Sequence, residues 1–537
     1  MTDRHVPVLV VGGSLVGLST SLLLASSGVP HLLVERHRGT AVHPRAASFH
    51  QRTMEIFRSV GLQQAVEAAA EKEFVQNGAI VSVESLAAEE MRYFFRHFNE
   101  GVERLSPTSR LFITQIGLEP LLRQHAQDRG AEHRYATELV DFEQDDDGVT
   151  SVIRSRDGGA EERVRSDWLV AADGSHSLVR ERCGIGMLGR GAFAHCVTIY
   201  FRADMRELIG DRNLSVVYVN HPELLGFFRF SITGDAGFLA VFHTVEPDGS
   251  RDTHVAADLD TARCVALVQK ALGADIPVEI DDVQRWTAAA GWGERFQDRR
   301  VFLAGDAAHV MPPTGGFGGN TGVGDAHNLA WKLALVTGGR AGAALLDTYD
   351  AERRPIGELI VEQAYTRYVL RVDPSLSREG LAQPMDEASI ELGPIYRSAA
   401  VLPDGEDDGA PVEDPRTPSG RPGTRAPHLA VELDGARASV HDVLGRGFVL
   451  LAGPDGQDWC AAATEVAESL GAPLEAHRVA VDTPLADPAG TFPEVFGTGP
   501  DGVVIVRPDG VIAWRAGAAS RDPRADVEQA MRRLLFR

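Results

Sequence analysis

The hydrophobic pattern changes its period several times along the chain, and each change marks a different kind of element. Near the N-terminus, an apolar run at 8–11 precedes a Gly-rich turn, an apolar helical stretch to about Ser27 and a second apolar run at 31–34. Short continuous apolar runs between turn residues are typical of buried parallel strands, so this order predicts a β-α-β unit. Residues 6–34 lack Asp, Glu, Lys and Arg, which leaves a membrane span or a signal peptide as the alternative. Glycine and proline turns interrupt this stretch, which favours the β-α-β unit.

Residues 191–284 alternate between apolar and polar positions. The apolar runs at 197–201, 214–219, 227–232 and 238–244 are separated by turn-forming sequences, which predicts an antiparallel sheet. Residues 402–427 are instead rich in Pro, Gly and Asp and have no period, as expected of a linker or a surface loop.

The last part of the chain has a different order of elements. A strand at 448–452, a helix at about 459–470, a strand at 477–481, a hairpin at 503–514 and a final helix follow one another, an order that resembles a thioredoxin-like fold. Cys460 is followed by three alanines, so no dithiol can form there. We therefore expect a structural domain or an oligomer contact, with a redox role as the alternative.

Composition narrows the classes of function. A length of 537 residues suggests two to four domains, and a formal charge of −23 disfavours nucleic acid and anionic membrane surfaces as partners. The four cysteines have no paired spacing, so neither a disulfide framework nor a zinc pattern is visible. These features predict a cytoplasmic enzyme with free thiols.

The run at 301–333 gives the strongest indication of chemical function in the sequence. An apolar strand ends at Gly305-Asp306, a loop rich in Pro and Gly spans 312–319, and a helix is expected from about Asn320. A carboxylate at a strand end can bind sugar-like hydroxyls, glycines let the backbone approach a flat ligand, and a helix N-terminus stabilises negative charge. A ribityl chain, a flat ring and a ring that becomes anionic on reduction together describe a flavin. A metal site at His309 and Asp306 is a weaker alternative, because no third ligand has a suitable spacing.

The N-terminal unit supplies a nucleotide-binding pattern. Gly12 and Gly17 frame the first turn, and Glu35 ends the second strand, about 20 residues beyond it. Ser14 stands where the ideal pattern has glycine, but its small side chain still admits a phosphate and its hydroxyl can donate to it. A further turn, Asp173-Gly174, follows the apolar strand at 168–171.

These motifs together resemble those of the flavoprotein aromatic hydroxylases, the group of p-hydroxybenzoate hydroxylase. The resemblance implies that Asp306 and Gln115 contact the ribityl chain, that the segment around Arg45 runs over the flavin and that Asp173 contacts both FAD and NADPH. The FAD-binding residues that it implies are Gly12, Ser14, Leu15, Val16, Gly17, Glu35, Arg36, Arg45, Gln115, Leu139, Asp173, Asp306, Pro313, Gly316, Gly318, Gly319 and Asn320.

Within this family, the C-terminal unit makes the chain most similar to bacterial hydroxylases of polycyclic aromatic polyketides, such as the aklavinone and tetracenomycin oxygenases. The resemblance implies that NADPH or NADH reduces FAD, that reduced flavin and O2 form a C4a-hydroperoxide and that this species hydroxylates a polycyclic phenol, with no catalytic side chain required. A Baeyer–Villiger or antibiotic-inactivating monooxygenase is the alternative. A non-catalytic flavoprotein fits less well, because the cofactor motifs are intact.

Residues that contact the substrate are harder to identify. The aromatic candidates are Tyr218, Phe228, Phe230 and Phe242, although their alternating spacing equally suits a sheet core. His221 and Arg229 are candidates to deprotonate a phenol, with a surface position as the alternative for each.

The predicted fold class is α/β (α+β overall). A Rossmann-like FAD-binding domain of residues 1–75, 105–190 and 285–395 is interrupted by an antiparallel substrate domain of residues 76–104 and 191–284. A linker at 396–427 leads to a thioredoxin-like domain at 428–537 without a redox motif. The expected partners are a small polycyclic aromatic substrate and O2, without nucleic acid or membrane, and we expect a monomer or a homodimer.

Overall fold

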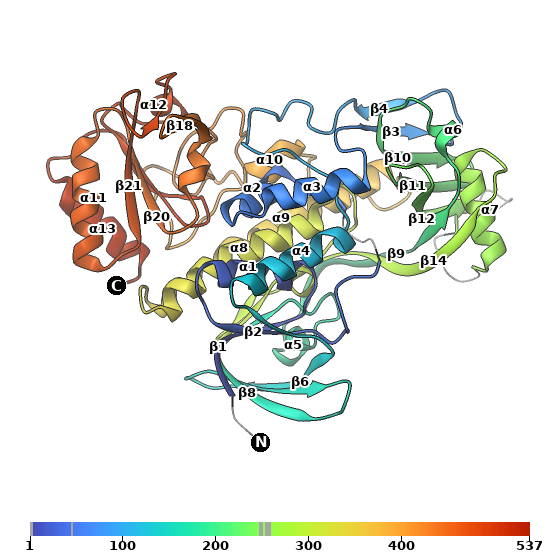
Figure 1. The fold of residues 1–537 in the computed structure, drawn as a ribbon, viewed down its shortest axis with the longest axis horizontal. Helices are drawn as coiled ribbons and strands as arrows, with labels where there is room; N and C mark the ends of the chain where they lie inside the picture. The colour runs from blue at the N-terminus through green and yellow to red at the C-terminus, as the bar shows by residue number, and fades with distance from the viewer. Residues whose placement is uncertain (1–3, 44–46, 246–250, 253–258) are drawn as a thin grey trace.

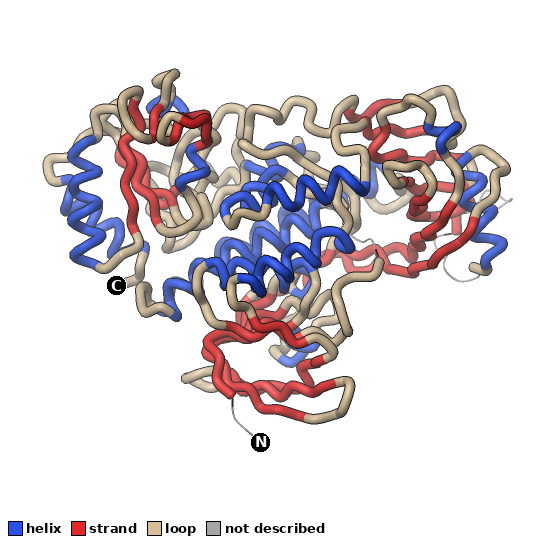
Figure 2. The backbone as a smooth tube through the Cα atoms, viewed as in Figure 1, coloured by secondary structure: helices blue, strands red, loops and turns tan. Residues whose placement is uncertain are grey.

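The computed structural model describes residues 4–43, 47–245, 251–252 and 259–537, and it contains three sheets around a central group of helices (Figure 1). An eight-stranded sheet contains both strands of the predicted β-α-β unit. A nine-stranded sheet lies to the right in Figure 1, and a seven-stranded sheet belongs to the C-terminal domain on the left. Figure 2 shows that the helices lie between the three sheets as well as on their outer faces. The mixed α/β fold class predicted from the sequence is thus confirmed.

The eight-stranded sheet follows the order β15-β16-β8-β1-β2-β5, with β6 and β7 off this path. Its strands are β1 (Arg4–Val11), β2 (His31–Val34), β5 (Glu132–Arg134), β6 (Thr137–Gln144), β7 (Val149–Ser155), β8 (Glu161–Ala171), β15 (Gln297–Asp298) and β16 (Val301–Leu303). Helix α1 (Leu15–Ser26) joins β1 to the parallel β2, as the sequence predicts. Within the described ranges, no helix combines the length and the apolar character that a membrane crossing requires.

The central helices pack against this sheet and against one another. They are α2 (Gln51–Ser59), α3 (Gln63–Glu73), α4 (Gln115–Asp128), α5 (Leu178–Arg182), α8 (Phe317–Thr337), α9 (Thr348–Arg371) and α10 (Glu387–Leu392), with the short 3-10 turns η1 (Gly305–Ala307) and η2 (Ala343–Leu345). Helix α4 begins at Gln115 because the Thr114 hydroxyl accepts a hydrogen bond from the Gly117 amide. Helix α8 begins at Phe317, three residues before the expected start at Asn320, because Gly316 adopts a left-handed φ of 68° that ends the preceding loop.

The nine-stranded sheet contains the alternating segments found in the sequence. Its strands are β3 (Ala79–Val83), β4 (Arg92–Phe95), β9 (Met187–Arg202), β10 (Leu214–His221), β11 (Leu224–Phe230), β12 (Ala236–Val245), β13 (Arg251–Asp252), β14 (Glu279–Gly293) and β17 (His309–Val310). Two helices accompany it, α6 (Arg206–Ile209) and α7 (Thr261–Leu272), and α7 packs on one face. Strands β9 and β14 are 16 and 15 residues long and continue through positions 190 and 285, where the sequence suggested domain boundaries.

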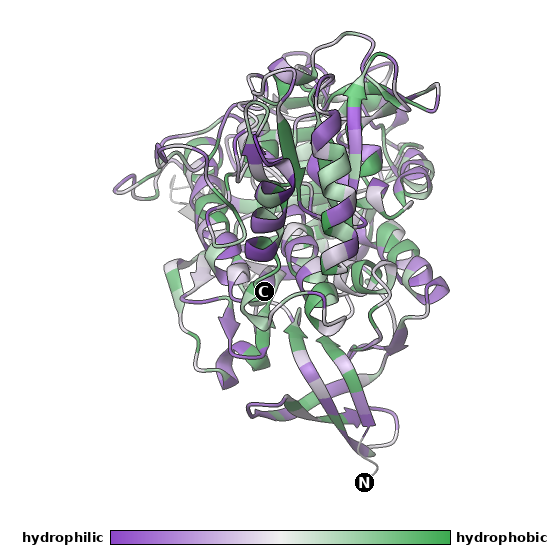
Figure 3. Cartoon of the chain, turned by 90° about the vertical axis from the view of Figure 1, so that its left-hand side faces the viewer, coloured by the Kyte–Doolittle hydropathy of each residue, from purple (hydrophilic) through white to green (hydrophobic). Residues whose placement is uncertain are grey.

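The C-terminal domain has its own core. Its elements are β18 (Ala430–Leu433), β19 (Ala436–Ser439), η3 (Val440–Val443), β20 (Phe448–Ala452), α11 (Gln457–Leu470), β21 (Leu474–Ala480), β22 (Leu485–Ala486), α12 (Phe492–Val495), β23 (Val503–Val506), β24 (Ile512–Ala516) and α13 (Pro523–Leu534). Strand β20 is parallel to β21 and antiparallel to β23. Helices α11 and α13 pack against each other and cover the sheet, and Figure 3 looks onto this side of the molecule. Cys460 is half-buried on α11, and burial raises the pKa of its thiol to about 11.

The end of the segment between α10 and β18 is not the exposed linker that its composition suggests, although residues 403–409 are exposed. No helix or extended strand lies between residues 393 and 429 in the structure, yet Thr424 and Ala426 are fully buried. The Ala426 amide donates to the Gly510 carbonyl, and Arg425 forms a buried ion pair with Glu55 of α2. The part of the segment around Arg425 is therefore fixed against both neighbouring domains.

Candidate functional site

Four motifs from distant parts of the chain meet at the carboxyl ends of adjacent parallel strands. Val11, Ala171 and Leu303 are aligned in register, so the turns at Gly12, Asp173 and Asp306 follow three neighbouring strands. Glu35 follows β2, the next strand along. Ligands of open parallel sheets bind at this edge. The structure thus brings together residues that the sequence assigned to one cofactor.

The first turn requires glycine for geometric reasons. Gly12 has a φ of +104°, and a Cβ there would lie 2.2 Å from the Ala172 carbonyl oxygen. A Cβ at Gly17 would lie 1.8 Å from the Gly12 carbonyl oxygen. Helix α1 then begins at Leu15 with no acidic residue in its first turn, so its N-terminal amides are suited to an anion such as a pyrophosphate. Val16 packs against the turn at Gly305, which joins this motif to the second one.

Ser14 forms a hydrogen bond with the carboxyl group of Glu119, a residue that the sequence analysis did not select. Its hydroxyl donates to Glu119 Oε1 at 2.6 Å, and Gln115 Nε2 donates to Ser14 Oγ at 3.2 Å and to Glu119 Oε1 at 3.0 Å. Glu119 is fully buried, and burial raises its pKa. The signal for Glu119 was its position four residues after Gln115, on the same face of a helix.

Glu35 is held by the backbone around it. Its carboxylate accepts hydrogen bonds from the Gly13 amide at 2.6 Å and from the His37 amide at 2.8 Å. Arg36 is exposed beside it, and Leu139 is buried on β6. Arg45 lies outside the described residues.

The two aspartates differ in their surroundings. Asp173 is mostly buried, its Oδ1 atom has no hydrogen-bond partner among the described residues, and burial raises its pKa. Asp306 is exposed on η1. Arg180, on α5, donates to the carbonyl oxygens of Ser175 and Ala307 and so joins the two turns.

A buried carboxylate supports the Asp306 turn from behind. Asp325 of α8 accepts hydrogen bonds from the Gly305 amide at 3.0 Å and from Arg353 Nε at 2.8 Å. Its Oδ2 atom also lies 2.7 Å from Nε2 of His309, so His309 has a structural partner. No group of three candidate metal ligands occurs among the described residues.

The loop at 312–319, here called the Pro-Gly loop, completes the edge. Pro313 is exposed and Gly316 is partly exposed, whereas Gly318, Gly319 and Asn320 lie in the first turn of α8.

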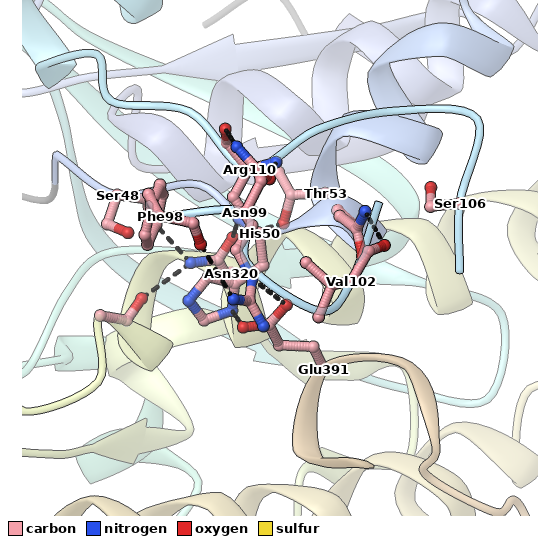
Figure 4. A network of polar contacts seen from close by, with 12 residues as sticks. Ser48, His50, Thr53, Phe98, Asn99, Val102, Ser106, Arg110, Asn320 and Glu391 are labelled. Carbon is pink, nitrogen blue, oxygen red and sulfur yellow. Dashed lines mark hydrogen bonds and ion pairs between the residues drawn. The ribbon is translucent and has the colours of Figure 1, made fainter. Parts of the chain in front are cut away.

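Both polar atoms of the Asn320 side chain are engaged by protein groups (Figure 4). Its Oδ1 accepts from the His50 amide and the Thr53 hydroxyl, and its Nδ2 donates to the carbonyl oxygens of Ser48 and Gly316. We therefore assign to Asn320 the role of holding the Pro-Gly loop against α2.

The predicted aromatic residues fall on opposite faces of the nine-stranded sheet. Phe228 and Phe230 lie in the apolar core beneath α7, so the expectation that they contact a substrate is not supported by their position. Tyr218 and Phe242 lie on the other face, where both contact Phe227 at ring-centroid distances of 5.9 and 5.8 Å. The sequence analysis did not select Phe227. Since consecutive residues of a strand face opposite sides of a sheet, its position next to Phe228 could have indicated it.

Arg229 does not lie at the surface, which was the alternative to a role in deprotonating the substrate. Its side chain is 3% exposed and lies 4.2 and 4.0 Å from the ring centroids of Phe74 and Phe112. It donates to the Ala47 carbonyl oxygen, and burial lowers its pKa to about 9. Since this value still leaves a cation at neutral pH, Arg229 does not suit a general base. His221 is the last residue of β10, is partly exposed and accepts a hydrogen bond from the Glu223 amide.

Taken together, the residues at the edge fit FAD. The glycine turn brings backbone amides to the start of α1, Asp173 has an unpartnered oxygen, and Asp306 is exposed at a strand end. These are groups that can bind a pyrophosphate and the hydroxyls of a ribityl chain.

Comparison with known proteins agrees with this geometry. Residues 5–364 match the FAD binding domain family, and residues 419–537 match the aromatic-ring hydroxylase C-terminal family. The chain is 50% identical to 4-methyl-5-nitrocatechol 5-monooxygenase of Burkholderia sp, over 100% of this chain and 98% of the relative. It is 42% identical to an aklavinone 12-hydroxylase of Streptomyces purpurascens, over 100% of both chains.

Solved structures agree as well. The structure of aklavinone-11 hydroxylase with FAD and aklavinone superposes with a TM-score of 0.93 at 41% identity, and that of the flavin-dependent monooxygenase PieE with FAD and substrate superposes with 0.87 at 32%, each over 100% of both chains. The chain therefore belongs to the FAD-dependent aromatic-ring hydroxylases and is a flavin-dependent aromatic monooxygenase.

Proposed function

We propose that this enzyme hydroxylates a phenolic ring of a polycyclic aromatic substrate and consumes NADPH or NADH and O2. The observation that supports a flat substrate best is the aromatic face of the nine-stranded sheet. Phe227 lies at its centre between Tyr218 and Phe242, and Phe242 contacts Tyr368 of α9 at 5.7 Å. Tyr218 and Phe227 are only partly buried by the protein itself, so their rings can stack on a ligand.

The residues at the sheet edge would hold the cofactor. Gly12 to Gly17 would take the pyrophosphate, Glu35 a ribose hydroxyl, and Asp306 with Gln115 the ribityl chain. The Pro-Gly loop would lie along the flavin ring, and the N-terminus of α8 would favour its negative charge. Bound FAD would accept a hydride from the nicotinamide and activate O2.

Tyr218 would orient the substrate through its hydroxyl. Burial raises the pKa of this phenol, although Arg371 of α9 opposes the shift, so the group keeps its proton at neutral pH. A protonated phenol donates a hydrogen bond, which suits an oxygen atom on the substrate ring.

A second candidate substrate class is a single-ring catechol. The identity of 50% to a 4-methyl-5-nitrocatechol monooxygenase, over the whole of this chain, favours it. Both classes share an electron-rich phenolic ring, so they differ in the size of the ligand that the aromatic face accepts.

The test is consumption of NADPH by the purified holoenzyme with polycyclic phenols, nitrocatechols and simple phenols, with the mass of each product from mass spectrometry and its structure from NMR. Strong stimulation by a polycyclic phenol, and a product heavier by one oxygen atom, supports the proposal. Stimulation by nitrocatechols alone supports the second candidate, and an inserted ring oxygen would identify a Baeyer–Villiger reaction instead.

The cofactor assignment needs a separate test. Asp306→Ala should lower the flavin content of the purified protein, whereas Asp211→Ala, at an exposed position next to the nine-stranded sheet, should not. Full flavin content in Asp306→Ala would refute the assignment of this carboxylate.

A further inference from the structure

His50 connects the Pro-Gly loop to α10 (Figure 4). Its Nε2 atom lies 3.1 Å from the Gly315 carbonyl oxygen, and its backbone amide donates to Asn320 Oδ1 at 2.9 Å. The imidazole side chain is only 6% exposed and meets the Phe317 ring edge-on, at 5.5 Å between centroids. One residue at the start of α2 thus contacts both the loop at Gly315 and the first turn of α8 at Asn320.

The Gly315 contact determines which ring nitrogen of His50 is protonated. A carbonyl oxygen can only accept a hydrogen bond, so Nε2 must carry the proton. In a neutral imidazole, Nδ1 then presents a lone pair. This Nδ1 atom lies 3.8 Å from Oε1 of Glu391 on α10. This separation is longer than a hydrogen bond, so a small movement is needed before a protonated Glu391 can donate to Nδ1, whereas a carboxylate would place one lone pair against another.

The surroundings of the pair make both protonation states of Glu391 accessible. Arg110 donates to Glu391 Oε2 at 3.0 Å and to the Phe98 carbonyl oxygen at 3.2 Å. Arg367 of α9 and Glu387 of α10 are the other charged groups that act on His50. Burial, with a smaller contribution from Asp386, outweighs Arg110 and Arg367 and raises the pKa of Glu391 to about 7. Burial and Arg110 lower the pKa of His50 to about 3, so His50 stays neutral while Glu391 titrates.

The pair also has a route for exchanging its proton. His50 and Glu391 both line a cavity of about 80 Å³ between α2, α8, α9 and α10, and its lining also includes Tyr396 and Asp509. The lining includes polar side chains, and a cavity of this volume can hold water, since one molecule needs only about 10–15 Å³.

We propose that His50 and Glu391 are positioning residues for the Pro-Gly loop, and that the proton on Glu391 selects the His50 tautomer that donates to Gly315. When Glu391 releases its proton to the cavity, the His50 proton moves from Nε2 to Nδ1. The Nδ1–H group then donates to the new carboxylate. The hydrogen bond to Gly315 is then lost, and the loop keeps its other anchors, the Asn320 side chain and the Thr314 hydroxyl, which donates to the Ala364 carbonyl oxygen. This inference rests on the proposed contact between the Pro-Gly loop and the flavin ring.

Two measurements test the proposal. The first is the ring 15N spectrum of histidine-labelled holoenzyme across neutral pH, with the His50 signals assigned by their absence in His50→Gln. The second is the affinity of the apoprotein for FAD, followed by flavin fluorescence over the same range. In the wild type, the tautomer should change near pH 7, and FAD affinity should fall about five-fold as the pH rises, the effect of about one hydrogen bond.

Three variants separate the mechanism from simple packing. Glu391→Gln places a permanent donor opposite Nδ1, so the tautomer should stay constant and FAD affinity should stay high at every pH. His50→Gln keeps a donor for Gly315 without a second tautomer, so its affinity should also be independent of pH. Glu358→Gln, at an exposed position of α9, should follow the wild type.

Other results would overturn the proposal. A constant His50 tautomer in the wild type would refute the link to Glu391, as would a wild-type pH dependence in Glu391→Gln. A tautomer change with unchanged FAD affinity would refute the link to the loop. Failure of the cofactor assignment itself would appear separately, as full flavin content in Asp306→Ala, and would leave the 15N result interpretable.

Discussion

Arg507 donates to both carboxylate oxygens of Glu352, and neither side chain is exposed to solvent. Arg507 belongs to the hairpin of the C-terminal domain, and Glu352 belongs to α9 of the flavin-binding part. Lys332 of α8 also donates to Glu352 at 2.8 Å, and Asp509 pairs with Arg507. Two cations and two anions therefore form one buried cluster that joins the domains.

Arg507→Ala should loosen this junction. Removal of one partner leaves Glu352 and Asp509 buried with a single cation, so the free energy of unfolding should fall by about 3–5 kcal/mol. Chemical denaturation followed by circular dichroism measures this change. Arg532→Ala, which breaks an exposed pair with Glu528, should cost less than about 1 kcal/mol. Equal losses in the two variants would show that the buried cluster does not hold the domains together.

Two glycines at opposite ends of α1 offer a matched comparison. Both have positive φ, +104° at Gly12 and +72° at Gly28, but a new Cβ meets the Ala172 carbonyl only at Gly12. Gly28→Ala should lower stability by about 1–3 kcal/mol and keep FAD, because only backbone strain is added. Gly12→Ala should lose FAD as well, because the turn itself must move. Flavin content after gel filtration distinguishes them, and bound flavin in Gly12→Ala at the wild-type level would contradict the assignment.

Phe227 and Phe228 are neighbours in sequence that face opposite sides of the same sheet. Phe228→Ala should cost about 3–5 kcal/mol of stability, because the ring is 1% exposed and packs in the core under α7. Phe227→Ala should cost less stability but raise the KM for an aromatic substrate. Thermal unfolding and steady-state kinetics on both variants test this prediction, which an unchanged KM in Phe227→Ala would refute.

The raised pKa of Glu391 also predicts a pH effect on stability. The folded protein holds a proton on this carboxyl up to about pH 7, above its usual value of 4.5. The resulting stabilisation is complete below pH 4.5 and is lost as the pH rises towards 7, in total on the order of 3 kcal/mol. In Glu391→Gln, the free energy of unfolding should lack this dependence on pH. Urea titrations at several pH values between 4.5 and 7 measure the slope of that free energy against pH. Identical slopes in wild type and variant would count against a buried neutral carboxyl.

The thiol of Cys460 should react slowly with alkylating reagents. A thiol pKa raised to about 11 from the ordinary 9.0 lowers the thiolate fraction by about 100-fold at neutral pH. Alkylation by iodoacetamide, followed by mass spectrometry, should therefore be about 100-fold slower at Cys460 than in an unstructured peptide of the same sequence. Rapid alkylation, or loss of hydroxylation in Cys460→Ser, would reopen a redox role for this domain.

Local patterns were sufficient for much of the fold. The glycines at 12 and 17, the acids at 35 and 306 and the short apolar runs before them predicted a β-α-β unit and a second cofactor motif, because tight turns and buried strands depend on neighbouring residues. The helix at α8 was placed three residues too late, since the left-handed Gly316 looked like one more loop glycine. The segment around Arg425 was predicted to be exposed, because its composition does not reveal the partner Glu55, which lies far away in the sequence.

The sequence by itself determined which family the chain resembles and predicted which groups bind the cofactor, because those groups lie in short motifs with fixed spacing. Only the tertiary structure decided which face each aromatic side chain occupies and which charges are buried together. Phe227 and Phe228, or His50 and Glu391, acquire their roles from packing between elements that are remote in the chain. Burial also sets the pKa of Glu391 and Cys460, and burial is a property of the assembled fold rather than of any one segment.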